Sequence, residues 1–507
     1  MKKIIRRRLD KRKRQTERRL ARAREREDTG RPAFGASRAQ FEVADRVHAT
    51  SFGAVAALHR LATKSGLVAG IDAGLELLKK HRPYHESDHV LNIAYNALCG
   101  GRVLEDIELR RNDVAFMDAL GVAAIPDPTT AGDFCRRFAA SDVEQLMDII
   151  NDARLNVWAR QGPEFTAETA RIDADGSIVG TKGECKQGMG LSYKGIWGYH
   201  PLLVSLANTS EPLFIVNRSG NRPSSESAAH YLDRAIALCR RAGFEDVLLR
   251  GDTDFSQTTH LDRWHEGGVR FVFGYDARKN LKTRATDLEA KAYRELARHA
   301  ETAFEVVPRA TQPRVKEQIV RANGYKNIIL RSEDVAEFDY QPVACDRAYR
   351  MVVLRKNLSI AKGELALFDD IRYFFYITND WAMDAMDVVR EANHRCDQEN
   401  LIAQLKGGVR ALHAPVNTLD ANWAYMVMTA LAWSLKAWVA LWSRIHPRWR
   451  RKHEAERTAL LRMDFRTFCA QMISIPAQVL TTGRRLIVRF LAWRPQLPVL
   501  FRLLDAL

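Results

Sequence analysis

The periodicity of the chain changes at residue 171, and this change limits the folds open to it. Residues 171–179 alternate apolar and polar side chains as a strand does, whereas the preceding residues follow helical spacing. Further strands are predicted at 201–206, 213–217 and 247–250, with an amphipathic helix before the last of them. Strands in a meander followed by alternating helices and strands predict a mixed α/β sheet flanked by helices.

The chain is strongly basic, with a formal net charge of +16 and a pI near 9.6. A surplus of this size favours a polyanionic partner, and nucleic acid is the first candidate. Much of the charge lies near the N-terminus, at Arg6, Arg7, Arg8, Lys11, Arg12, Lys13 and Arg14. We expect this arm to bind phosphates as a helix and to be disordered otherwise, although a solvated charged tail explains the composition equally well.

The cysteine content favours a reducing compartment, and the sequence does not indicate a membrane protein. The seven cysteines form no C-x-x-C pair, which argues against a thiolate zinc site, and the histidines show no metal-ligand spacing. The first residues run into arginines and do not resemble a signal peptide. Ser434 and Lys436 interrupt the longest apolar stretch, 421–441, so we interpret it as a buried helix.

Shifts in pattern divide the chain into six expected parts. These are a basic arm (1–39), a helical DNA-binding region (40–165), the first part of the α/β core (166–277), a β-rich insertion (278–370), the second part of the core (371–415) and a C-terminal helical domain (416–507).

Acidic residues stand at the ends of the predicted elements. Asp173 and Asp175 lie two apart on a strand and project from one face, and Asp252 follows an apolar strand and a glycine. Glu399 lies on a helix predicted at 381–407. Each alone is more often a cap or turn residue, but together they form an oxygen ligand set suited to two Mg²⁺ or Mn²⁺ ions.

The helix predicted at 381–407 carries a mixed stripe of charge. Offsets of four and eleven residues bring Arg395, Glu399 and Lys406 onto one side, with an apolar face opposite. An amphipathic helix with ordinary i,i+4 charge pairs explains the same pattern.

Flanking residues resemble those of known nucleases and transposases. Asp175 is followed by Gly-Ser, as is the first metal ligand of ribonuclease H-like nucleases, and the Arg-Gly-Asp-x2-Phe at 250–255 resembles the second motif of bacterial insertion-sequence transposases. Arg395-x3-Glu399-x6-Lys406 matches the latter part of Tyr-x2-Arg-x3-Glu-x6-Lys, the pattern of the insertion-sequence-four and thirteen-eighty group of DDE transposases. Ala392 occupies the tyrosine position, and His394 is a candidate substitute.

This resemblance implies a DNA transposase with a ribonuclease H-like catalytic core. Asp175, Asp252 and Glu399 would be the catalytic metal ligands for two divalent cations, and Arg395 and Lys406 would contact phosphates. The implied partners are double-stranded DNA, both the transposon terminal inverted repeats and the target, and a second copy of the chain when DNA ends are bound. We expect the two copies to pair through the aromatic C-terminal helices. The implied location is the bacterial cytoplasm, at the nucleoid.

Two other functions stay open. One is a ribonuclease H-like DNA nuclease without strand transfer, and the other is a non-catalytic DNA-binding repressor derived from a transposase.

Neighbouring residues carry less specific patterns. Asp173 either supports the metal ligands without binding an ion itself or is the partner of Arg171 or Lys182, and Asp254 is expected to cap the helix after Asp252. Residues 186–200 mix basic and aromatic side chains suited to nucleic acid, but a hairpin with its aromatic rings packed inward is the preferred interpretation.

Overall fold

The computed structural model describes residues 3–25, 39–43, 47–296, 326–362, 365–483 and 485–507, with the backbone alone at 326–329, 360–362 and 365–369. Residues 26–38 of the basic arm and 297–325 of the expected insertion lie outside the described residues.

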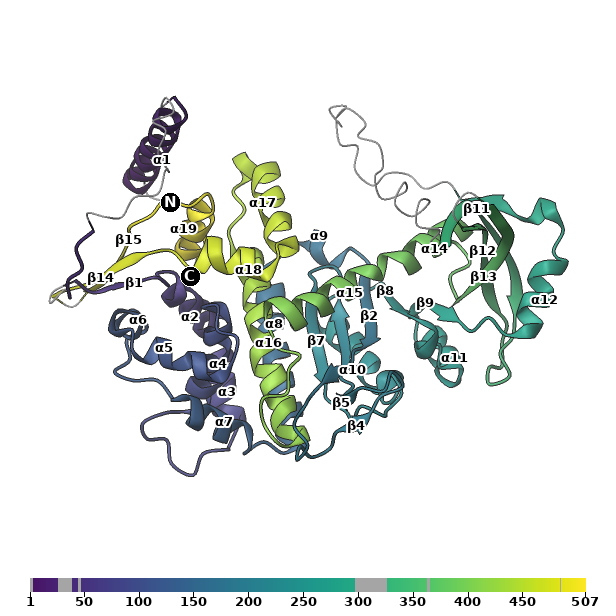
Figure 1. Ribbon diagram of the computed structural model, residues 1–507, viewed down its shortest axis with the longest axis horizontal. Coiled ribbons are helices and arrows are strands. Elements are labelled where there is room, and N and C mark those ends of the chain that lie inside the picture. Colours follow the sequence, from purple (N-terminus) through teal and green to yellow (C-terminus); the bar gives the residue numbers. More distant parts are fainter. Residues whose placement is uncertain (1–2, 26–38, 44–46, 297–325, 363–364, 484) are drawn as a thin grey trace.

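A mixed sheet occupies the centre of the molecule (Figure 1). It contains β2 (Ala170–Gly176), β6 (Leu202–Leu206), β7 (Glu211–Val216), β8 (Val247–Gly251) and β9 (Arg270–Tyr275). Strand β2 pairs antiparallel with β6 and parallel with β8, and β9 runs parallel to β8. The predicted mixed sheet with flanking helices is therefore confirmed.

Long antiparallel strands extend this sheet beyond β9. They are β13 (Leu365–Thr378), β12 (Tyr349–Lys362) and β11 (Lys326–Tyr340), with the short β10 (Arg294–Glu295) at the edge and α12 (Lys279–Asp287) beside them. The β-rich character expected of this segment is confirmed where it is described. Strand β13 crosses position 370 without a break, so the segment and the core share one sheet.

Helices cover both faces of the sheet, because successive side chains of its strands point alternately into two apolar clusters. On β8, Val247 and Leu249 face the main core, which includes α10 (Ala228–Arg241), whereas Leu248 packs with Val388 and Val389. These two valines belong to α14 (Ala385–His394), which continues into α15 (Cys396–Ala403).

The helix predicted at 381–407 is interrupted. It begins at Ala385, where the Asp384 carboxylate accepts a hydrogen bond from the Met386 N–H, and it breaks at Arg395. After α15 the backbone widens into a π-helical turn, Gln404–Gly408, which contains Lys406, so the single regular helix predicted at 381–407 does not form.

The N-terminal region is helical, as predicted, and packs against a long C-terminal helix. Its elements are α2 (Val55–Lys64), α3 (Leu67–Gly74), α4 (Glu86–Leu98), α5 (Glu108–Arg111), α6 (Val114–Leu120), α7 (Pro128–Cys135), α8 (Ala140–Trp158) and α9 (Pro163–Thr166). The long helix α16 (Leu419–Trp442) lies between α4, α8 and β7. By length and composition α16 is apolar enough to cross a membrane, yet its apolar window is completely buried inside the protein.

A buried carboxylate joins three of these elements. Glu211 of β7 accepts hydrogen bonds from Arg154 of α8 at 3.0 Å and from Trp438 of α16 at 2.8 Å. Arg154 and Glu211 have no exposed side-chain surface, so each charge depends on the other.

The C-terminal region is not wholly helical, which corrects the prediction for 416–507. Besides α17 (Arg450–Arg462), α18 (Phe465–Phe468) and α19 (Leu497–Ala506), it contains a hairpin of β14 (Ala477–Thr482) and β15 (Arg485–Phe490). Strand β1 (Ala49–Thr50) pairs with this hairpin, so distant parts of the chain form one small sheet. The basic arm forms the projecting helix α1 (Lys3–Arg24), which has no buried residue.

Lys436 generates a prediction about stability and pH. The side chain is 1% exposed, and Nζ donates to the Leu461 carbonyl at 2.7 Å. Burial lowers the pKa of Lys436 to about 7. Above that pH the unfolded chain holds a proton that the folded chain lacks, so the lysine destabilises the fold less as pH rises toward 10.

We therefore expect the free energy of unfolding of the wild type, relative to Lys436→Met, to rise by roughly 1 kcal/mol per pH unit between pH 7 and 10. Urea denaturation across this range measures the difference, and Lys452→Met, at an exposed lysine, is the control. Parallel stability curves for wild type and Lys436→Met would contradict the prediction.

Candidate functional site

One face of β2 is polar and directed at α14 and α15. Ile172 and Ala174 are buried in the main core, so Arg171, Asp173 and Asp175 project from the opposite face. Arg171 forms an ion pair with Glu391 of α14 at 2.9 Å, which confirms the direction of this face.

Asp173 is held by Arg250, its register partner on β8. The guanidinium donates from Nε to Oδ1 at 2.7 Å and from Nη2 to Oδ2 at 2.8 Å. Its Nη1 donates to Glu391 Oε2 at 3.0 Å. Burial disfavours the charge of Arg250, but these two carboxylates outweigh that cost and raise its pKa. The expected partner of Asp173, Arg171 or Lys182, is therefore wrong.

Arg395 joins two of the predicted metal ligands. Its Nη1 lies 3.2 Å from Asp175 Oδ2, and its Nη2 lies 3.6 Å from Glu399 Oε1. The break between α14 and α15 falls at this residue. Helix α15 is fixed on the sheet by Gln398, whose amide donates to the Leu203 carbonyl at 3.2 Å and accepts from the Ser205 hydroxyl. Gln398 is a supporting residue that the sequence did not identify.

Asp252 completes the set at the carboxyl end of β8. Its Oδ1 accepts the Asp254 N–H at 3.0 Å, so Asp252 itself caps the short turn Thr253–Phe255 and the cap expected from Asp254 is wrong. A Cβ on Gly251 would lie 2.6 Å from Phe255 Cβ, which explains the glycine in this motif.

The three carboxylates influence one another electrostatically. Burial raises the pKa of Asp175 to about 6, the Arg395 charge opposes this, and the charges of Asp252 and Glu399 raise it further. Burial also raises the pKa of Asp252, with Glu399 acting in the same direction. Asp175 is 16% exposed and Glu399 61%, so the group is open to solvent on one side. Among the described residues, the ligand atoms of these three acids do not all lie within 4.8 Å of one another, so the structure places them around Arg395 without closing them into a metal-sized cluster.

Lys406 and a small sheet lie beside this cluster. Burial lowers the pKa of Lys406, the charge of Lys194 lowers it further, and that of Asp175 raises it. Lys194 lies in the turn between β4 (Gly190–Leu191) and β5 (Trp197–Tyr199), which form a small sheet with β3 (Val179–Gly180). Tyr199 is buried, but Tyr193 is 79% exposed and Trp197 55%, so the expected inward packing of the rings is wrong for two of them.

Other predicted site residues lie elsewhere. His394 is exposed at the end of α14, and Ala392 packs against the apolar cluster of Leu248 and Val388, so the tyrosine position faces the sheet in this chain. The arm residues Arg6, Arg7, Arg8, Lys11, Arg12, Lys13 and Arg14 lie on α1, away from α15 (Figure 1).

Arg250 is the buried charge whose removal tests this arrangement. Arg250→Met leaves Asp173 without its bidentate partner, and we expect a loss of about 3–5 kcal/mol in the free energy of unfolding. Arg171→Met is the matched control, because Arg171 is 35% exposed and Glu391 keeps Arg250 as a partner. We expect that control to cost no more than about 1 kcal/mol. Equal effects in urea denaturation would show that Arg250 does not hold the elements together.

Comparison with known proteins identifies the family. The model of the family described as transposase DDE domain group 1 matches residues 43–507. Among solved structures, a piggyBac transposase synaptic complex with hairpin DNA, determined by cryo-EM, is similar with a TM-score of 0.37 and 10% identity, over 83% of this chain and 84% of that chain. No curated protein matches. With its family model matching nearly the whole length, the chain belongs to the DDE transposases of group 1.

Proposed function

We propose that this transposase cuts DNA at transposon ends and joins the freed 3′ end to target DNA, using Asp175, Asp252 and Glu399 as metal ligands. The observation that carries the proposal is the arrangement around Arg395, whose guanidinium contacts Asp175 and Glu399 and whose charge also acts on Asp252. One cation balancing three acids from β2, β8 and α15 is the charge pattern of a site that takes up divalent cations.

Two Mg²⁺ ions, or Mn²⁺ in their place, would activate the attacking oxygen and stabilise the leaving oxygen of a phosphodiester. The chain's own residues position these groups. Arg250 fixes β2 against β8 and α14, and Gln398 fixes α15 on β6. Arg395 and Lys406 provide positive charge beside the acids for the phosphate that reacts.

Strand order supports a ribonuclease H-like core. The sequence of neighbours β7-β6-β2-β8-β9 is an antiparallel meander continued by two parallel strands, as the resemblance of the Asp-Gly-Ser motif implies. Asp175 is at the end of its central strand and Asp252 directly follows the next. In this proposal β10–β13 form the insertion between Asp252 and Glu399.

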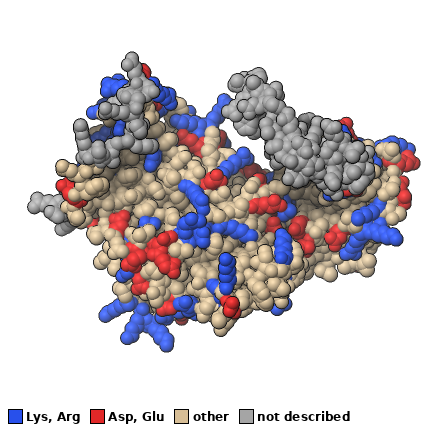
Figure 2. Space-filling view, viewed as in Figure 1, with Lys and Arg blue, Asp and Glu red and all other residues tan. Residues whose placement is uncertain are grey.

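The charge distribution supports DNA as the partner. In Figure 2, Lys and Arg side chains gather on the projecting α1 and near the middle of the viewed face, where acidic side chains lie on either side of them. Lys194 and the exposed rings of Tyr193 and Trp197 add basic and stacking groups beside Lys406. We propose that two copies pair two terminal repeats, but α16 is buried within one chain and its aromatic residues do not supply that contact.

Glu399→Gln tests the metal site. We expect DNA binding to be retained and Mg²⁺-dependent cleavage of DNA carrying the element's own ends to fall by on the order of 10³-fold, since metal ions supply several kcal/mol of transition-state stabilisation. Asp397→Asn, an exposed acid two residues earlier on α15, is the control and should cleave normally. Undiminished cleavage by Glu399→Gln would refute the assignment.

The same substrates separate the alternatives. Cleavage without joining of labelled ends to target DNA would identify a nuclease. Binding by the wild type without metal-dependent cleavage would identify a repressor.

Arg395→Ala tests the phosphate contact. Mg²⁺ would bind the carboxylates and leave Arg395 available for phosphate. With Mg²⁺ present we therefore expect Arg395→Ala to bind transposon ends more weakly, and the slope of log binding constant against log salt concentration to fall by about one. Arg390→Ala is the control, because Arg390 pairs with Asp387 on an exposed side of α14. An unchanged slope for Arg395→Ala would remove Arg395 from the phosphate contacts.

A further inference from the structure

Two histidines and a glutamate meet at the start of α4, outside the carboxylate site. The potential ligand atoms of His81, His85 and Glu86 all lie within 4.8 Å of one another. His81 Nε2 is 3.1 Å from Glu86 Oε2, and the rings of His81 and His85 stack with their centroids 4.9 Å apart. His85 is the residue that precedes the helix and Glu86 is its first residue.

The carboxylate of Glu86 is buried without a permanent counter-charge. Its side chain has no exposed surface, and Oε1 accepts the N–H groups of Leu77 at 3.1 Å and Leu78 at 3.0 Å. Oε2 accepts no hydrogen bond from the described residues, although it lies close to His81. In the described part of the chain its ion-pair partner is His81, which is charged only when protonated. A buried carboxylate in this position is costly unless a cation joins it.

The donor set selects the type of cation. Imidazole nitrogen and carboxylate oxygen in a two-to-one ratio are ligands of Zn²⁺ and similar first-row metals, whereas Mg²⁺ and Ca²⁺ prefer oxygen alone. Tetrahedral ligands at about 2.0–2.1 Å from zinc lie roughly 3.3 Å apart, close to the His81–Glu86 separation. The N–H groups of Leu77 and Leu78 donate to the Glu86 carboxylate and fix its orientation. Metal-binding carboxylates are commonly oriented by hydrogen bonds of this kind.

We propose that His81, His85 and Glu86 bind one Zn²⁺ or similar transition-metal ion. His81 is half exposed, so the remaining coordination position faces solvent and is open to water. Asp88 accepts the His85 N–H at 2.9 Å, and its charge offsets the partial positive charge of the helix start.

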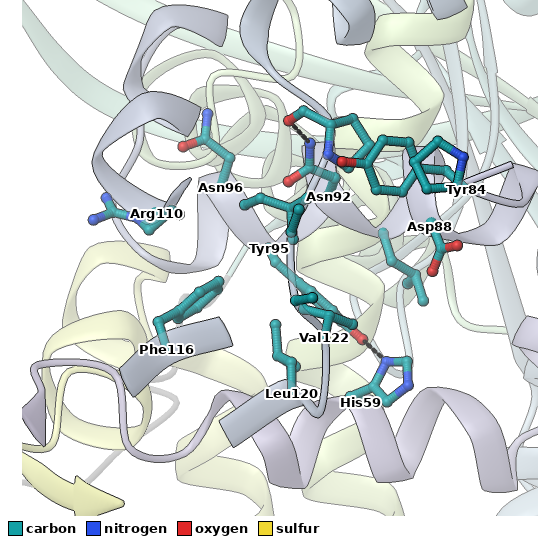
Figure 3. Close-up of a pocket in the computed structure, with 16 residues that line it drawn as sticks. His59, Tyr84, Asp88, Asn92, Tyr95, Asn96, Arg110, Phe116, Leu120 and Val122 are labelled. Atoms are coloured by element: carbon teal, nitrogen blue, oxygen red, sulfur yellow. Dashed lines mark hydrogen bonds between the residues drawn. The ribbon is translucent and has the colours of Figure 1, made fainter. Parts of the chain in front are cut away.

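The ion would fix the loop that covers a neighbouring cavity. Pro83 and Tyr84 lie between the two histidines and line a cavity of about 310 Å³. Tyr84 is at one end of this cavity and Arg110 and Phe116 at the other (Figure 3). Metal binding would therefore anchor the Pro83–Tyr84 segment onto α4 and stabilise the N-terminal helices.

The test must separate this site from the catalytic acids. Full-length protein carrying Asp175→Asn, Asp252→Asn and Glu399→Gln is freed of metal with a chelator and titrated with Zn²⁺ in a calorimeter. We expect one equivalent of Zn²⁺ to bind and raise the melting temperature, with no such effect of Mg²⁺. Adding His81→Ala and His85→Ala should weaken Zn²⁺ binding at least 100-fold and abolish the rise in melting temperature.

Matched variants keep the result interpretable. His230→Ala, at an exposed histidine on α10, should bind Zn²⁺ as the parent does. His81→Gln changes a half-exposed side chain, so it should melt as the parent does in chelator and still lose zinc affinity. Zinc binding that is equally tight in His81→Gln and the parent would overturn the proposal, as would bound zinc that does not raise the melting temperature.

Discussion

Arg250 makes the buried contact on which the geometry of the site depends. Its guanidinium holds Asp173 of β2 and Glu391 of α14, while its own strand leads to Asp252. The strands that lead to Asp175 and Asp252 and the helix that precedes α15 therefore meet at one side chain. A buried ion network of this kind tolerates little displacement, because any movement leaves a charge without a partner. The relative placement of β2, β8 and α14 thus depends on one buried guanidinium.

Local pattern was sufficient to predict much of the fold. The alternation at 171–179 led to β2, and the apolar stretch at 421–441 led to the buried helix α16. The motif resemblance grouped Asp175 with Glu399, and both lie beside Arg395. These features depend on periodicity and on motif spacing, both of which are visible in one sequence.

Features that depend on how distant segments pair and pack could not be predicted in this way. Asp173 pairs with Arg250 and not with Arg171 because strands β2 and β8 place Asp173 opposite Arg250. The sequence alone does not show how two strands align. The π-helical turn at Lys406 depends on how α15 meets the following chain, and the hairpin β14–β15 depends on pairing with distant β1. The proximity of His81 and Glu86 arises from a loop and not from a helical repeat, so no pattern in the sequence indicates it.

The continuity of β13 has a mechanical consequence. This strand runs for fourteen residues from the end of the β-rich segment to its pairing with β9, next to the strand that leads to Asp252. At about 3.3 Å per residue its length is roughly 45 Å, more than the width of a DNA duplex. The extension is thus continuous with the central sheet and is not a separate domain joined by a linker. A force on the far end of β13 would therefore reach the strand that leads to Asp252 through two sets of backbone hydrogen bonds, from β13 to β9 and from β9 to β8.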